Sequence, residues 1–199
     1  GGLHATRVEP VACRNVGSSS LLVAGTRIMP RQTLDDLFTA TLGELYDAES
    51  QLAVGLPVLR RAALDADLDQ LVEEMREATC GQMLRYETMF EMLGRRAKGE
   101  PCWSVAPLVV DACDAARSKC AFSRHTGIAL ALLSVLHLQV VRLQSLAAWA
   151  QRCDMEDLAE LLTTPLGEKV AFARRLAFHA LAADHVATRD GEPAGRTLN

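Results

Sequence analysis

The chain has few aromatic residues and lacks the patterns that mark several common functional classes. Aromatic residues make up only 5% of its 199 residues, whereas 49% are hydrophobic. This apolar fraction, carried largely by Ala and Leu, is enough for one core and favours helices over sheets. We therefore expect a single all-α domain.

The cysteines show neither a CxxC pair nor the spacing of a zinc ribbon. We therefore expect no metal–thiolate site and no dense disulfide framework, and interpret them as reduced cysteines of a cytoplasmic protein. There are six, at positions 13, 80, 102, 113, 120 and 153.

The sequence also has no basic stripe and no long apolar run. Its formal net charge is -4 and its pI is about 5.7, which argues against general nucleic-acid binding. No run of hydrophobic residues reaches the roughly 18 needed to cross a bilayer. We expect neither nucleic acid nor membrane as a partner.

Composition divides the chain into three parts. Residues 1–30 mix Gly, Ser, Arg and Pro without periodicity and are predicted to be a disordered leader. Residues 31–184 carry helical periodicity and form the predicted domain. Residues 185–199 are polar and are predicted to be a flexible tail.

Apolar periodicity and capping residues predict four long helices and one short connecting helix, that is, a four-helix bundle, with Thr33 as the N-cap of the first helix and Gly94 as the C-terminal cap of the second. Prolines at 57 and 165 are expected to kink or divide the first and last of the long helices. The predicted spans are 33–63, 65–94, a short helix from 104 or 107 to 118, 123–153 and 154–183.

Glu49 interrupts the apolar seam of the first helix. Hydrophobic residues recur there at alternating steps of four and three, and Glu49 occupies one step that should be apolar. A buried carboxylate is costly unless it is paired or binds a metal. The seam consists of Phe38, Leu42, Leu45, Leu52, Leu56, Leu59 and Ala63.

The other long helices carry polar residues at or beside their own seams. These are Glu77 and Gln82, His137 and Gln139, and Glu168, which is expected to point inward with Leu158, Leu161, Phe172 and Leu176. Carboxylates from four helices, joined by Glu-x-x-His pairs, can hold two metal ions inside such a bundle. No Glu-x-x-His pair occurs on these helices.

Several stretches resemble the YciE/YciF family of ferritin-like, stress-associated bacterial proteins, to which ferroxidase activity is ascribed. They are TLDDLF, ELYDAESQL, ATCGQMLRYETMFEMLG, VLHLQVV and PLGEKVAFARRL, together with an isolated Cys102. The resemblance implies a ferritin-like bundle in which Glu49 is a ligand of iron or manganese. It covers about three quarters of the chain, from Thr33 to about Ala180.

Five acidic positions of the family pattern are changed in this sequence. They are occupied here by Ala78, Leu136, Gln139, Lys169 and Ala173. A two-metal centre needs about four carboxylates to balance its charge, so a full centre is not expected. The remaining candidate metal ligands are Glu49, Glu168, His137 and Glu77, holding iron or manganese at low occupancy or no metal. Alternatively, the ammonium group of Lys169 supplies the positive charge.

Two functions stay open. One is a stress-associated metal-binding protein with weak ferroxidase activity, and the other is a non-catalytic bundle that serves as a structural or protein-interaction module. Because the helix at 123–153 is apolar nearly all round, we expect a homodimer. His125, His179 and His185 have no acidic partner at ligand spacing and are not candidates.

Overall fold

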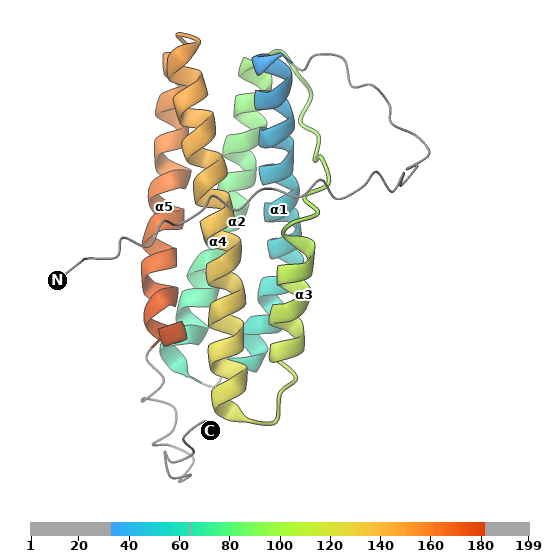
Figure 1. Cartoon of the computed structure of the whole chain (residues 1–199), viewed down its shortest axis with the longest axis vertical. Coiled ribbons are helices and arrows are strands. Elements are labelled where there is room, and N and C mark those ends of the chain that lie inside the picture. The colour runs from blue at the N-terminus through green and yellow to red at the C-terminus, as the bar shows by residue number, and fades with distance from the viewer. Residues whose placement is uncertain (1–32, 64, 182–199) are drawn as a thin grey trace, which may run out of the picture. The chain divides into compact units, whose positions relative to one another are not determined.

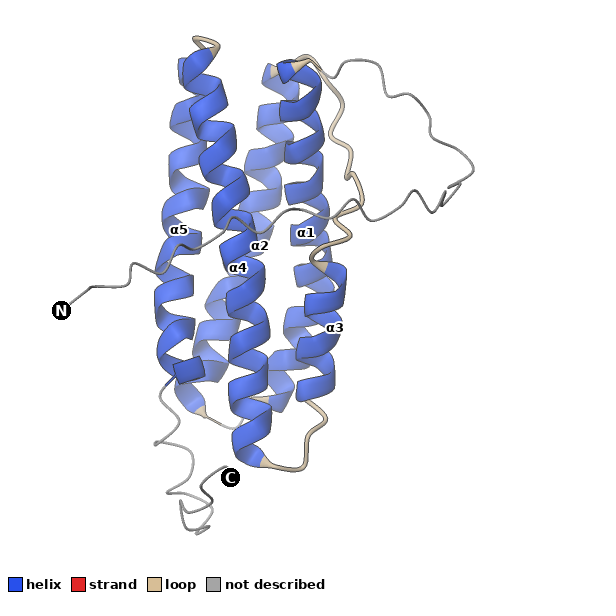
Figure 2. Ribbon diagram, in the orientation of Figure 1, coloured by secondary structure: helices blue, strands red, loops and turns tan. Residues whose placement is uncertain are grey.

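The computed structural model describes residues 33–63 and 65–181, which form five helices and no strand (Figures 1 and 2). The predicted all-α bundle with a short connecting helix is thereby confirmed. The predicted leader, 1–30, and tail, 185–199, lie outside the described residues. The helices are α1 (Leu34–Ala62), α2 (Ala66–Met92), α3 (Ala106–Ala115), α4 (Ala121–Arg152) and α5 (Glu156–Leu181).

Along the chain, α1 and α2 are antiparallel, α2 and α4 are parallel, and α4 and α5 are antiparallel, so that each long helix is antiparallel to the long helices it packs against (Figure 1). The connection from α2 to α4 returns along the whole bundle and contains α3, which packs against α1 and α4. This long crossover connection allows the consecutive long helices α2 and α4 to run parallel within one bundle.

The first helix begins with the predicted capping residue. Thr33 Oγ1 accepts a hydrogen bond from the Asp36 amide at 3.1 Å, and Asp36 Oδ2 accepts one from the Thr33 amide at 3.2 Å. This reciprocal capping box satisfies two amides that the helix cannot pair internally. Pro57 lies inside α1 and does not divide it. Pro165 likewise lies inside an undivided α5.

The connection after α2 is fastened to α1. Gly94 ends the second helix with a φ of +64°, a conformation that glycine adopts without strain. The Glu100 amide then donates to the Gly43 carbonyl oxygen at 3.1 Å. A Cβ at Gly43 would lie 3.0 Å from the Lys98 carbonyl oxygen, so this close approach requires glycine.

A polar layer separates the interior into two hydrophobic clusters. One cluster includes Leu52, Leu56, Leu71, Leu132 and Leu176, and the other includes Leu42, Leu45, Tyr86, Leu143 and Leu162. The buried Glu49, Gln82, Gln139 and Lys169 fall between them along α1, α2, α4 and α5. Every long helix therefore contributes one buried polar side chain at the same level.

The inward face of α5 differs from the prediction by one residue. The buried positions are Leu158, Leu162, Pro165, Lys169, Ala173 and Leu176, whereas Leu161, Glu168 and Phe172 are only partly buried. The sequence allows two frames, that is, two choices of inward-facing residues one position apart, because Leu161 and Phe172 are each followed by another apolar residue. The structure therefore turns Lys169, and not Glu168, directly into the core.

Within the described residues, α4 is the one helix long and apolar enough to cross a membrane by length and composition. Half of its most hydrophobic window is buried inside the bundle. Its neighbours α1, α3 and α5 all pack against it. A helix that packs against neighbours on several sides is expected to be this apolar even where it does not cross a membrane.

Candidate functional site

A buried ion pair occupies the centre of the polar layer. Lys169 Nζ lies 2.6 Å from Glu49 Oε1, and the side chains of Lys169 and Glu49 are 3% and 0% exposed. Gln139 Nε2 donates to the same Glu49 oxygen at 2.9 Å. Three helices thus converge on one carboxylate oxygen, and a lysine supplies the positive charge. We refer to Glu49 and Lys169 as the central pair.

Glu168 belongs to a second network at the edge of the layer. Its Oε2 accepts hydrogen bonds from Gln82 Nε2 at 2.9 Å and from Arg85 Nη1 at 3.2 Å. The Glu168 and Arg85 side chains are each about one third exposed, at 32% and 34%. Glu168 is therefore balanced by Arg85, an arginine near solvent, and not by Lys169.

Tyr86 lies beside both networks and is fully buried on α2. Burial, followed by the negative charges of Glu49 and Glu168, raises the pKa of Tyr86 well above its usual value. The hydroxyl therefore stays protonated at neutral pH. It has no hydrogen-bond partner, and neither do Glu49 Oε2, Gln82 Oε1 and Gln139 Oε1.

Two of the predicted metal ligands lie away from this centre. His137 and Glu77 are exposed on α4 and α2, whereas Glu49 is buried and Glu168 is half-buried. The structure therefore brings only the two glutamates into the polar layer. The role of all four residues as metal ligands stays a prediction.

The side chains of the polar layer do not fit a two-metal carboxylate centre. The ammonium of Lys169 already contacts Glu49, and a second cation beside it would be repelled. The five positions at which the family pattern has acids are buried or half-buried, so they do line the interior. Here they carry Ala78, Leu136, Gln139, Lys169 and Ala173, which offer no carboxylate.

The remaining polar residues of the ELYDAESQL stretch hold the connection to α3. Asp47 Oδ2 accepts hydrogen bonds from the Cys102 amide at 2.8 Å and from Gln51 Nε2 at 2.6 Å. Tyr46 donates from its hydroxyl to Glu87 Oε1 on α2 at 2.8 Å. The match of Asp47, Gln51 and Cys102 to the family pattern therefore has a structural reason.

Sequence reasoning missed Arg85 and Tyr86 in this network and a separate cluster at one end of the bundle. There Asp65, His125 and His179 bring their ligand atoms within 4.8 Å of one another. The prediction that His125 and His179 are not candidates for want of an acidic partner is wrong, because Asp65 approaches both of them although it lies 60 and more than 100 residues away in the sequence. Local spacing carries no signal for such an arrangement. His185 lies outside the described residues.

The comparisons with known proteins agree with the fold and the motifs. Residues 33–187 match the family described as Domain of unknown function (DUF892). The protein YciF of Escherichia coli strain K12 is 28% identical over 145 residues, which are 72% of this chain and 87% of YciF.

Two solved structures resemble the bundle. The crystal structure of the E. coli stress protein YciF has a TM-score of 0.72 and 27% identity, covering 76% of this chain and 97% of that one. YcfI from Rhodopseudomonas palustris, described as "a putative structural protein", has a TM-score of 0.71 and 30% identity, covering 75% and 96%. The chain therefore belongs to the DUF892 family and is a helical bundle of the YciE/YciF type.

Proposed function

We propose that this protein is a non-catalytic, stress-associated bundle that serves as a structural or protein-interaction module. The observation that carries the proposal is the 2.6 Å contact between Lys169 Nζ and Glu49 Oε1 inside the polar layer. A lysine there takes the place that a metal ion takes in ferritin-like centres. The description of YcfI as a structural protein and of YciF as a stress protein supports the same assignment.

The charges of the layer also favour this function over ferroxidase activity. Two divalent ions bring four positive charges and need about four carboxylates. Only Glu49 is fully buried here, and Glu168 is shared with Arg85. Iron or manganese at Glu49 would require the Lys169 side chain to leave the core. The predicted metal binding is therefore the weaker of the two functions.

The decisive experiment compares wild type with Lys169→Glu. In air, Fe(II) should be oxidised no faster with the wild-type protein than in buffer alone. Mn(II) should not raise the Tm of wild type by binding in the polar layer. Lys169→Glu places a second carboxylate at Glu49, so we expect a lower Tm that Mn(II) partly restores. Lys119→Glu, on an exposed residue, is the matched charge-reversal control.

The wild-type, Lys169→Glu and Lys119→Glu proteins should all be compared in a His179→Gln background, so that the cluster at the end of the bundle does not contribute to the metal response. Rapid Fe(II) oxidation by the wild-type protein, lost on Glu49→Gln, would overturn the proposal and establish a ferroxidase. The proposal is supported if wild type neither accelerates Fe(II) oxidation nor gains Tm with Mn(II), and if Mn(II) raises the Tm of Lys169→Glu.

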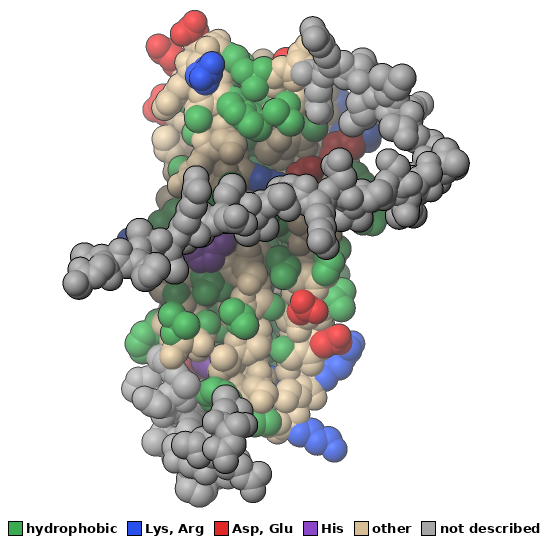
Figure 3. Space-filling model, viewed as in Figure 1, with side chains coloured by type: hydrophobic (Ala, Val, Ile, Leu, Met, Phe, Trp, Pro, Cys, Tyr) green, Lys and Arg blue, Asp and Glu red, His purple; other side chains and the backbone are tan. Residues whose placement is uncertain are grey.

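For the oligomeric state, we propose a cytoplasmic homodimer formed through the outer face of α4. Leu130 and Val141 on this helix are 56% and 59% exposed, three turns apart on one stripe with the exposed His137. Hydrophobic side chains also gather in the upper and lower parts of the face shown in Figure 3. Sedimentation of wild type and Leu130→Glu tests this, since a monomer at high micromolar concentration would contradict it.

A further inference from the structure

One end of the bundle holds three potential metal ligands that come from three different segments. Asp65 precedes α2, His125 lies in the second turn of α4, and His179 lies in the last turn of α5. We call these three residues the histidine cluster. Within the described parts of the chain, they are the one group of at least three such side chains whose ligand atoms lie within 4.8 Å of one another.

The distances leave room for an ion between the side chains. His179 Nδ1 lies 3.9 Å from Asp65 Oδ2, which is too long for a hydrogen bond. Two ligands on a tetrahedral Zn(II) ion, with bonds of about 2.0–2.1 Å, lie about 3.3 Å apart. The His125 and His179 rings are close as well, with centroids 5.3 Å apart. Small side-chain rotations would therefore close the three groups around one ion.

Burial of His125 without a hydrogen bond to its ring nitrogen Nδ1 is unusual, because buried polar groups are normally hydrogen-bonded. His125 is 5% exposed, and its ring Nδ1 has no hydrogen-bond partner in the structure. Burial, helped by the neighbouring His179, lowers the pKa of His125, and burial lowers that of His179. Because its Nδ1 has no hydrogen-bond partner, the buried His125 ring has a nitrogen available to bind a metal.

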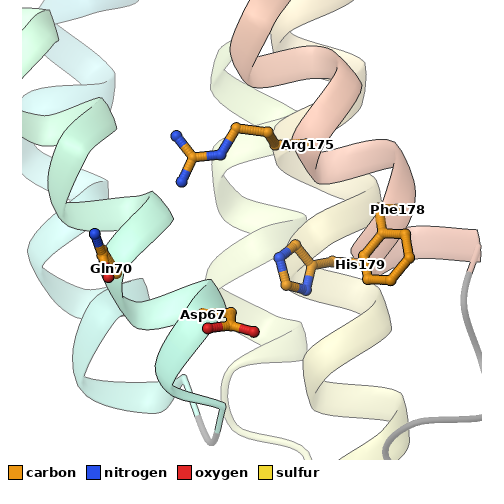
Figure 4. Close-up of a pocket in the computed structure, with 5 residues that line it drawn as sticks. All are labelled: Asp67, Gln70, Arg175, Phe178 and His179. Atoms are coloured by element: carbon orange, nitrogen blue, oxygen red, sulfur yellow. The ribbon is translucent and has the colours of Figure 1, made fainter.

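The charges around the cluster suit a cation. Asp65 and Asp67 both face His179, and the nearest cation on α5, Arg175, forms an ion pair with Glu74. Figure 4 shows His179 pointing across the gap toward the start of α2, where Asp67 lies.

A cavity open to solvent reaches the histidine cluster at His179. It has a volume of about 310 Å³ and is lined by Asp67, Gln70, Arg175, Phe178 and His179 (Figure 4). An ion held by two imidazoles and one carboxylate would keep a further coordination position for water from this cavity. This donor set is typical of Zn(II) and of other divalent transition metals, and not of Ca²⁺ or Mg²⁺.

We propose that Asp65, His125 and His179 form a mononuclear site for a divalent transition metal, with Zn(II) as its simplest occupant. The site shares no residue with the central pair, and on α5 its His179 lies ten residues after Lys169. The proposal therefore stands or falls independently of the assignment of the central pair.

The test is a Zn(II) titration of chelator-treated protein in competition with a chromophoric chelator. Cysteines bind Zn(II) strongly, and Cys80, Cys120 and Cys153 are exposed, so accessible thiols are first alkylated under native conditions. We expect one saturable Zn(II) per chain in wild type. His179→Gln and Asp65→Asn should each weaken binding at least about tenfold, because each removes a ligand.

Matched controls are His137→Gln and Asp111→Asn, which change exposed residues of the same types elsewhere. They should bind Zn(II) as tightly as wild type. Absence of saturable binding in wild type, or equal affinity in wild type and His179→Gln, would overturn the proposal.

Imidazole NMR signals of the wild-type protein provide a readout that does not depend on how well the variants fold. Single His→Gln variants assign the signals. Zn(II) should shift those of His125 and His179 in the same titration step and leave that of His137 in place. A Zn(II) response confined to other histidines would exclude the cluster as the site.

Discussion

The centre of the bundle and its end both collect polar side chains from three segments, but the two arrangements differ in how the side chains contact one another. At the centre, Lys169 and Gln139 contact Glu49 directly, at 2.6 and 2.9 Å. In the histidine cluster, His179 Nδ1 and Asp65 Oδ2 lie 3.9 Å apart, beyond hydrogen-bond distance. The centre is closed by its own side chains, whereas the cluster leaves a gap.

The difference also appears in burial and access. Lys169 and Glu49 lie in a layer between two hydrophobic clusters. His179 instead lines a solvent-accessible cavity. A cation built into the chain suits the first environment, because no ion has to enter and lose its water there. An exchangeable ion suits the second. The comparison indicates that a family fold can keep its polar layer while any metal site lies elsewhere.

The largest effect should follow removal of the ammonium at the centre. Lys169→Met leaves Glu49 buried with only the amide of Gln139, so we expect a loss of about 3–5 kcal/mol in the free energy of unfolding. Urea denaturation at neutral pH, with chelator present, measures it. A cost below about 1 kcal/mol would show that the central pair is not a buried ion pair in solution.

The double variant Glu49→Gln, Lys169→Met provides the control for lost packing. It removes both charges, so most of the stability lost in Lys169→Met should return. If the double variant is as unstable as the single one, the loss comes from packing around the lysine side chain and not from an uncompensated carboxylate.

A smaller effect is expected from acidification of the metal-free protein at the histidine cluster. The pKa values of His125 and His179 are lowered by burial, so the unfolded chain takes up protons at higher pH than the folded chain does. Asp65 and Asp67 oppose this shift and Arg175 supports it. The stability that these histidines contribute is therefore complete above about pH 6.5 and falls below it.

Urea denaturation at pH 7.5 and 5.5, in the presence of chelator, measures this dependence. His179→Gln should lose less stability between the two pH values than wild type. His137→Gln changes an exposed histidine and should follow wild type. An identical pH dependence of all three proteins would mean that the cluster is not buried as described.

Much of the fold could be predicted from the sequence because helical periodicity and capping are local. Thr33 caps α1 as predicted, and Gly94 ends α2 with a positive φ. The inward position of Glu49 followed from its place in a seam of leucines. These features depend only on residues within a few helical turns, so a single sequence contains them.

The partners within the site could not be predicted in the same way. Lys169 was a candidate partner of Glu49, but the apolar pattern of α5 allowed two frames and placed Glu168 inward. Packing against the other three helices selects the frame, and that information is not local. The histidine cluster was missed for the same reason, since Asp65 approaches His125 and His179 only after the helices have packed.

The smallest predicted effect is that of a substitution at Glu168, which tests which residues of α5 face the core. Glu168 is one residue from Lys169, yet it is about one third exposed and bonded to Arg85 and Gln82. Glu168→Gln keeps an acceptor for both donors and removes an ion pair near solvent, so we expect a loss below about 1 kcal/mol. Urea denaturation beside Lys169→Met measures it. Equal, large losses for the two variants would mean that α5 has no single inward frame, and the central pair would no longer be distinct from its neighbour.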